Sequence, residues 1–321
     1  MRPPPDHRPV VARAPGCHER DSHVSIPFRM RRDHARRAPR TSPFRRSVAE
    51  GFSDPAASKR RSPLRFVLLV FALSVPFWLA GAVVGRQLLP GLPAVDALIT
   101  LCPLLAASIL AYRENGAAGV TALLRRAVDY DRIRAKGWYA PILLLMPAVM
   151  VVAYGLMRVM GTPLPTPHVP VLAAPVMFLA FFVGAVAEEV GWSGYATDPM
   201  QARWSALRVG ILLGLVWAAW HVVQLLELHR PPSWIAWWCL YTVAGRILTV
   251  WLYNGAGKSV FATVVFHAMA NVSWQLFPNG GSHWDPRITG LLLALVAAMV
   301  TIVWGPRTLA RPVRLRGTSR T

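Results

Sequence analysis

Five polar residues lie within long apolar stretches of the chain, and their chemical types could support hydrolysis. Glu188 and Glu189 are adjacent, His221 lies on the next apolar stretch, and His267 and Asn271 lie four positions apart on a later one. Charged groups are costly at membrane depth and are usually retained there for function. A carboxylate beside imidazoles can act as a general base on water, or can join them in holding a zinc ion that activates the water. Either arrangement predicts hydrolysis inside a membrane.

The elements that carry these residues are apolar runs of about 20 residues, the length that crosses a hydrocarbon core of roughly 30 Å. The chain has 321 residues, of which 54% are hydrophobic, and its mean hydropathy is +0.37. We therefore expect an all-α, polytopic transmembrane helix bundle. Eight spans are predicted, near residues 65–85, 93–112, 138–157, 173–196, 207–227, 233–253, 259–277 and 287–305.

The net charge of +20 is concentrated outside these runs. Fifteen of the 35 Lys and Arg residues fall within residues 1–62, and further clusters lie at 113–137 and at the C-terminus. This is the positive-inside pattern, so both termini are predicted to be cytoplasmic. The pattern favours a basic tail beside anionic lipid over a nucleic-acid-binding arm, so no nucleic-acid partner is expected. The Arg- and Ala-rich composition resembles that of high-GC bacterial proteins, which favours a bacterial plasma membrane.

Three regions follow from this organisation. Residues 1–62 are rich in Arg, Pro and Ser and are predicted to be a disordered basic cytoplasmic tail. Residues 63–306 form the eight-span domain, and residues 307–321 form a second basic cytoplasmic tail. Within 113–137 a short interfacial helix is expected, because apolar residues recur at helical spacing with Arg125 and Arg126 on the other side: Val120, Leu123, Leu124 and Val128.

The five polar residues are predicted to lie at similar depths in the bilayer. With a rise of 1.5 Å per residue, Glu188 lies roughly 15 Å from the cytoplasmic helix ends, His221 roughly 20 Å, and His267 and Asn271 roughly 13 to 20 Å. His267 shares a helix face with Asn271, as Trp217 does with His221. A lone membrane histidine often only bonds a neighbouring helix. Unpaired carboxylates, however, are too costly to retain for packing, so a shared site is the better prediction.

The motifs EEVGWSGY, WAAWH and FHAMAN, on separate spans and in this order, resemble those of the CPBP family of CAAX-protease and bacteriocin-processing intramembrane endopeptidases. The family pattern is EExxxR, FxxxH and HxxxN, and the resemblance covers roughly residues 65–305. It implies hydrolysis of peptide bonds in membrane-bound proteins or peptides, within the lipid bilayer. Glu188 would be the water-activating carboxylate with His221 beside it, and His267 and Asn271 would bind the oxyanion or complete the site.

The resemblance leaves the mechanism open between a glutamate-type protease and a metalloprotease. If a metal such as zinc is used, its ligands would be Glu188, His221 and His267. No other cofactor is implied. The word CAAX in the family name does not establish that this protein acts on prenylated substrates.

Two positions depart from the family pattern. Trp217 replaces the phenylalanine of FxxxH and is expected to keep a large aromatic wall. Ser193 stands where the family usually has an arginine, which would pair with Glu189 four positions earlier on one helix face. We hypothesise that Arg246, within the sixth span, compensates by pairing with Glu189.

Other functions compete with this interpretation. The GWSG stretch fits the GxSG pattern of rhomboid serine proteases, in which Ser193 would be paired with His267. A transporter could use the same residues as a proton relay, although the sequence shows no convincing internal repeat. A non-catalytic immunity or scaffold protein of the same family is the main alternative. Glu188, Glu189, His221, His267 and Asn271 together favour a hydrolase.

Overall fold

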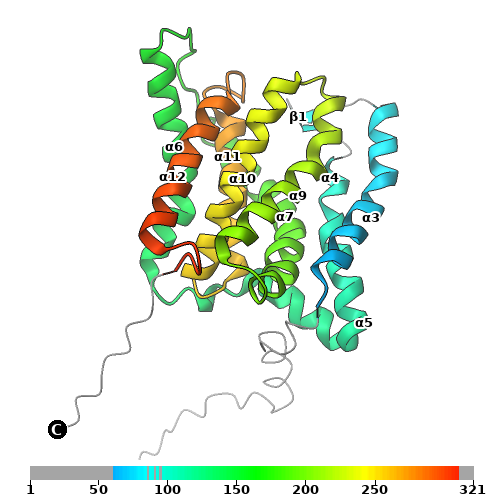
Figure 1. The fold of residues 1–321 in the computed structure, drawn as a ribbon. Coiled ribbons are helices and arrows are strands. Elements are labelled where there is room, and N and C mark those ends of the chain that lie inside the picture. The colour runs from blue at the N-terminus through cyan, green and yellow to red at the C-terminus, as the bar shows by residue number, and fades with distance from the viewer. Residues whose placement is uncertain (1–60, 85–86, 90–91, 94–95, 311–321) are drawn as a thin grey trace, which may run out of the picture. The chain divides into compact units, whose positions relative to one another are not determined.

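Helices dominate the structure (Figure 1). The computed structural model describes residues 61–84, 87–89, 92–93 and 96–310, all within the unit Ser42–Thr321. The predicted tails lie almost wholly outside these residues and stay predictions. The elements are, in chain order, α3 (Pro63–Val84), β1 (Gln87–Leu89), β2 (Leu92–Pro93), α4 (Asp96–Ile99), α5 (Leu101–Arg125), η1 (Arg126–Val128), η2 (Tyr130–Arg132), η3 (Lys136–Trp138), α6 (Tyr139–Val159), α7 (Ala173–Glu189), η4 (Val190–Ala196), α8 (Thr197–Gln201), α9 (Ala206–Glu227), α10 (Pro232–Gly255), α11 (Val260–Leu276) and α12 (Pro286–Trp304).

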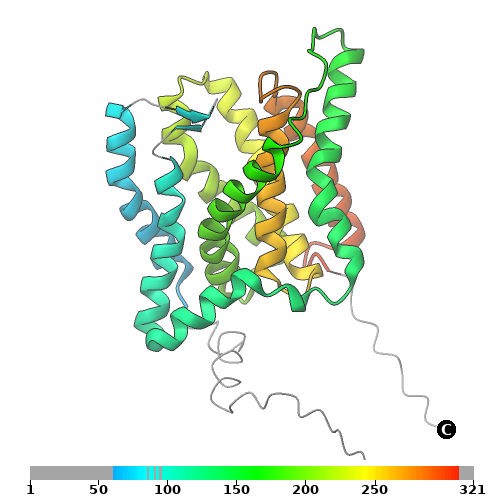
Figure 2. The same cartoon turned by 180° about the vertical axis from the view of Figure 1, so that it is seen from behind.

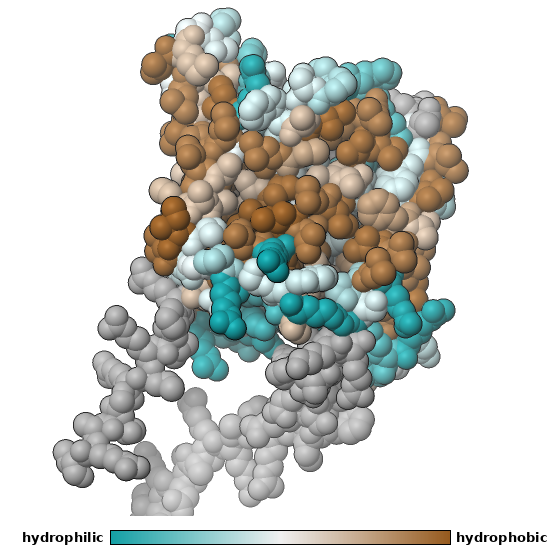
Figure 3. All heavy atoms as spheres, in the orientation of Figure 1, coloured by the Kyte–Doolittle hydropathy of each residue, from teal (hydrophilic) through white to brown (hydrophobic). Residues whose placement is uncertain are grey.

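The predicted all-α transmembrane bundle is confirmed, with β1 and β2 forming only one short antiparallel pair. Among the described residues, six helices are long and apolar enough to cross a membrane. The other two predicted spans correspond to α11, which is shorter at 17 residues, and α5, which is interrupted after Glu114. On the side of the bundle that Figure 3 shows, apolar residues form a belt and hydrophilic residues gather at the lower edge. The chain is therefore an integral membrane protein.

The bundle has two end faces, which Figures 1 and 2 show from opposite sides. One is the face where α3 begins and α12 ends, so the two ends of the helical bundle lie on the same side. We call it the basic face, after its exposed residues Arg65, Arg125, Arg134, Arg208 and Arg307. The other, called here the opposite face, carries the α9–α10 turn at 228–231 and the α11–α12 loop at 277–285.

Close contact between α9 and α10 depends on two glycines one helical turn apart. A Cβ added at Gly210 would lie 2.8 Å from the Cα of Ile247, and one at Gly214 would lie 2.8 Å from the Cα of Val243. Small residues spaced in this way let membrane helices approach until their backbones touch. This contact fixes the position of α10 relative to α9, and both helices carry residues of the site.

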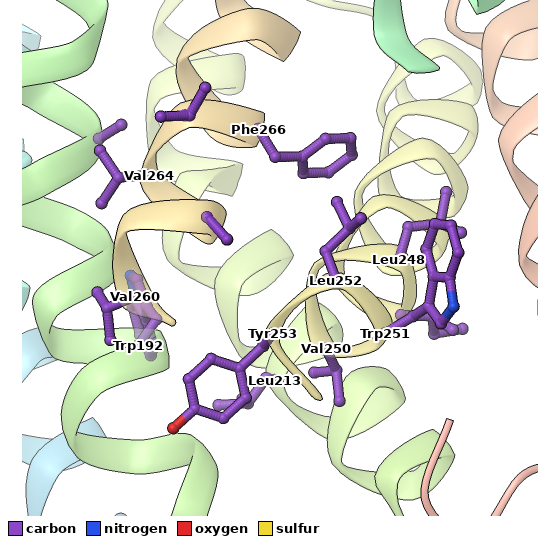
Figure 4. Packing of buried hydrophobic residues seen from close by; sticks show 14 of the residues in the cluster. Trp192, Leu213, Leu248, Val250, Trp251, Leu252, Tyr253, Val260, Val264 and Phe266 are labelled. Carbon is purple, nitrogen blue, oxygen red and sulfur yellow. The ribbon is translucent and has the colours of Figure 1, made fainter. Parts of the chain in front are cut away.

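A second set of buried residues holds α10 and α11 together near the basic face. Figure 4 shows Leu252 of α10 and Phe266 of α11 in the space between the two helices, with Val260 at the start of α11. Leu252 and Val260 are fully buried, and Phe266 is nearly so. Tyr253 points its hydroxyl away from this core and donates it to Asp198 at 3.0 Å. The core therefore ends at a layer of polar contacts.

The interfacial segment differs from its prediction in one respect. α5 has non-helical backbone angles at Asn115 and Gly116, and beyond this kink a second helical stretch runs to Arg125. Arg126, expected on the solvent side, is buried and donates to the carbonyl oxygen of Gly194 at 2.7 Å and to the hydroxyl of Tyr253 at 2.6 Å. The periodicity was misleading because Arg126 begins the turn η1, which faces the bundle.

Asp129, in the same segment, accepts hydrogen bonds from the Ser259 hydroxyl at 2.8 Å and from the Phe261 N–H at 3.0 Å. Burial raises the pKa of the Asp129 carboxyl, and these hydrogen bonds and the nearby Arg126 oppose that rise only in part. The segment is thus joined to the start of α11.

Candidate active site

The two glutamates lie where the fourth span changes its helical geometry. α7 ends at Glu189, and the next seven residues form the π-helix η4. π-Helical segments are rare in proteins, and those that occur often lie at functional sites. Glu188 and Glu189 have only 4% and 1% of their surface exposed. Two adjacent carboxylates at this depth require compensating partners.

Glu189 has such partners on three sides. Arg246 donates from one terminal nitrogen to both carboxylate oxygens at 2.9 Å, and Nδ1 of His267 lies 3.0 Å from Oε1. Ser193 donates its hydroxyl to Oε2. The hypothesised pairing of Arg246 with Glu189 is therefore present, and Ser193 contributes a hydrogen bond where the family arginine would stand. Glu189 has little capacity left to act on a substrate.

Glu188 has a different environment. The indole N–H of Trp217 donates to Oε2 at 2.7 Å, and among the described residues no other group is hydrogen-bonded to this carboxylate. Oε1 is therefore free to accept a hydrogen bond from water. The side chains of adjacent helical residues point about 100° apart, which explains how one carboxylate can face Arg246 while its neighbour faces Trp217.

Trp217 does more than the aromatic wall predicted for it. Its ring lies 5.4 Å from the Arg246 guanidinium carbon and stacks on Trp238 with a centroid separation of 5.8 Å and an angle of 12°. The sequence did contain a signal for its role, because a phenylalanine at this position would lack the N–H that contacts Glu188. The expectation of a large aromatic wall did not include this hydrogen bond.

The histidines are oriented by their Nδ1 atoms. Nδ1 of His221 lies 2.9 Å from the carbonyl oxygen of Trp217. Because a carbonyl oxygen only accepts, Nδ1 must carry the proton, which leaves the Nε2 lone pair of a neutral ring for another partner. Nδ1 of His267 faces Glu189 in the same way. Both rings thus keep Nε2 for chemistry.

A cavity of about 970 Å³ joins these groups, and its lining includes all five predicted site residues, Glu188, Glu189, His221, His267 and Asn271. The convergence predicted from their depth and helical spacing is present, because all five line one cavity. Their catalytic roles stay predictions.

The three residues proposed as zinc ligands do not fit one ion in this arrangement. Within the described ranges, no three His, Cys, Asp or Glu side chains lie close enough together to share a metal. Glu188 is tied to the Trp217 indole, and His267 faces Glu189. The predicted set Glu188, His221 and His267 is therefore not assembled as a tetrahedral site.

The rhomboid-like dyad is likewise not formed. A serine nucleophile needs its hydroxyl hydrogen-bonded to the histidine that activates it. Ser193 instead donates to Glu189, and it is 2% exposed.

Comparisons with known proteins agree with the geometry. The family model described as "Type II CAAX prenyl endopeptidase Rce1-like" matches residues 170–273, a range that contains all three motifs. The chain is 25% identical over 275 residues to "CAAX prenyl protease 2" of Methanococcus maripaludis, an alignment covering 76% of this chain and 95% of the relative. With two buried glutamates, two histidines and an asparagine around one membrane cavity, the chain is similar to the CPBP family of CAAX-type intramembrane endopeptidases in both its motifs and its site.

Proposed function

We propose that the protein hydrolyses peptide bonds of membrane-associated polypeptides, with Glu188 as the general base on water. The observation that supports this assignment is the unequal pairing of the two glutamates. Glu189 is held by Arg246, Ser193 and His267, whereas Glu188 keeps one carboxylate oxygen for water.

The reaction then follows from the remaining donors and acceptors. Glu188 takes a proton from a water molecule, and the resulting hydroxide attacks the carbonyl carbon of the scissile peptide. The Nε2 lone pair of His221 orients that water. The side-chain amide of Asn271 and a protonated Nε2 of His267 stabilise the oxyanion. Glu188 returns its proton to the departing amine, which leaves a carboxylic acid and an amine as products.

Glu189 and Arg246 act as a positioning pair in this proposal. Their charges cancel inside the bundle, and Glu189 fixes the orientation of the His267 ring. We assign Glu189 to holding the site together rather than to the chemical step.

We also propose that the basic face is cytoplasmic and that the membrane is a bacterial plasma membrane. The concentration of exposed arginines on that face supports the orientation. The Arg- and Ala-rich composition supports the bacterial assignment.

The decisive experiment compares membrane and secreted peptide fragments from host cells that express equal amounts of wild type, Glu188→Gln or Glu227→Gln. Glu227 is a matched control because it is a glutamate of α9 outside the cavity lining. Fragments lost with Glu188→Gln and retained with Glu227→Gln establish proteolysis and identify the substrate. Identical fragments in all three strains, with any phenotype of the wild type preserved in Glu188→Gln, would support the non-catalytic immunity or scaffold function.

A further inference from the structure

The cavity that contains the site opens at one end face of the bundle. We propose that substrates reach Glu188 from the opposite face and that this face is extracytoplasmic. The substrate is then a membrane-anchored polypeptide cleaved near the extracytoplasmic end of its hydrophobic segment. This inference rests on the proposed function and adds the side of the membrane on which that function operates.

One face of α10 marks the path. Trp234, Trp238, Thr242 and Arg246 all line the cavity and are spaced four positions apart, so they form a continuous stripe. At 1.5 Å per residue, the stripe runs about 18 Å from the Arg246–Glu189 pair toward the α9–α10 turn. There Arg230, which also lines the cavity, lies 4.7 Å from the Trp234 ring centroid.

The connecting segments give the same direction. Gly280, Gly281 and Ser282 of the α11–α12 loop line the cavity, as does Leu228 of the α9–α10 turn. In contrast, the described segments that connect helices at the basic face, 126–138, 202–205 and 256–259, contribute no lining residue. The mouth therefore lies at the opposite face.

The lipid-facing part of the wall belongs to the same half of the bundle. Leu101, Val176 and Val183 line the cavity while exposing 41%, 66% and 69% of their surface. Leu101 begins α5, and Val176 lies in the first turn of α7, and both helices start toward the opposite face (Figure 2). A polypeptide already anchored in that leaflet could thus approach from the side as well as from the mouth.

Charge assigns the two faces to the two sides of the membrane. The described arginines of the opposite face are few, namely Arg158, Arg230 and Arg287, and Arg287 pairs with Asp285 at 2.8 Å. The basic face carries many more exposed arginines. The positive-inside rule then puts the mouth on the extracytoplasmic side.

The residues that line the cavity indicate which kind of polypeptide segment it can accommodate. Six indoles surround the path, which favours apolar residues around the scissile bond: Trp217, Trp220, Trp234, Trp238, Trp274 and Trp284. The buried hydroxyl of Thr242 lacks a hydrogen-bond partner within the described residues, so it can bond the backbone of an extended chain. At 3.3 to 3.6 Å per residue, about five extended residues cover the distance from Trp234 to Arg246.

Thiol labelling in intact cells tests the sidedness without any assay of activity. Cys17, Cys102 and Cys239 are replaced by alanine in the full chain, and either Ser282→Cys at the mouth or Ala135→Cys at the basic face is added. Both positions are exposed. A membrane-impermeant maleimide should label Ser282→Cys in intact cells and Ala135→Cys only after permeabilisation. The reverse pattern, or equal labelling of both before permeabilisation, would overturn the inference.

Fragment mapping then tests the route. Glu188-dependent cleavage sites should lie at the extracytoplasmic flank of substrate spans, about five residues inside the point where the chain meets the mouth. Glu188-dependent sites at cytoplasmic flanks would refute the route while leaving the peptidase function standing. Labelling as expected, with no Glu188-dependent fragments, would refute the peptidase function and leave the orientation of the cavity established.

Discussion

The indole N–H of Trp217 donates to the carboxylate of Glu188 across 2.7 Å, which joins the helix of the second motif to the helix of the first. The carbonyl oxygen of the same residue accepts a hydrogen bond from the Nδ1–H group of His221. One side chain thus orients the proposed base, and its backbone orients the histidine beside that base. The position that departs from the family phenylalanine is therefore part of the polar site.

Trp217→Phe should lower kcat by roughly 10- to 100-fold with little change in KM. A hydrogen bond to a charged group contributes about 1.5–3 kcal/mol, and this one bears on the base and not on substrate binding. The measurement is steady-state cleavage of a Glu188-dependent substrate by the detergent-solubilised protein. Trp251→Phe is the control, because that indole is buried outside the cavity and its N–H has no hydrogen-bond partner among the residues that the structure describes. Equal kcat values for Trp217→Phe and wild type would contradict the positioning role.

Arg246→Leu should destabilise the protein by about 3–5 kcal/mol, because it leaves the buried charge of Glu189 without its cation. The midpoint of thermal unfolding in detergent measures the effect. Adding Ser193→Arg should recover part of the loss, since position 193 lies one helical turn from Glu189 and matches the family arrangement. A wild-type midpoint for Arg246→Leu alone would show that the ion pair does not hold the site together.

Treatment with EDTA followed by dialysis should leave the cleavage rate unchanged. The prediction follows from the donor arrangement, in which the Glu188, His221 and His267 side chains are not gathered around one point. The rate of Glu188-dependent cleavage before and after treatment is the measurement. Loss of activity that zinc restores would instead show that the side chains rearrange around a metal, and the mechanism would then be metal-dependent.

Gly184→Leu should raise KM without loss of stability. Gly184 lines the cavity one turn before Glu188, and a Cβ there meets no atom within 4 Å. Leucine also has a higher helix propensity than glycine. Gly214→Leu is the contrasting variant, because its side chain would meet the backbone of Val243, and overpacking of this kind costs about 1–3 kcal/mol. Unchanged KM in Gly184→Leu would mean that substrates do not pass this wall.

Much of the fold could be predicted from the sequence because membrane insertion depends on the length of apolar runs. Seven of the eight predicted spans match a helix to within about two residues, η4 being counted with α7. The second differs because α5 continues past a kink into the interfacial segment. Arg126 was assigned to the wrong side, since local periodicity does not show that the next residues turn toward the bundle.

The candidate site, like the fold, could be predicted from the sequence only in part. The sequence alone indicated which residues could support the chemistry and predicted that they share a depth, because the rise of a helix is regular. Only the tertiary structure decided which glutamate is paired, that Trp217 contacts Glu188, and that the cavity opens away from the basic face. These relationships depend on the rotation of each helix about its axis and on its neighbours, and both are set by contacts such as Gly210 against Ile247, between residues far apart in the chain.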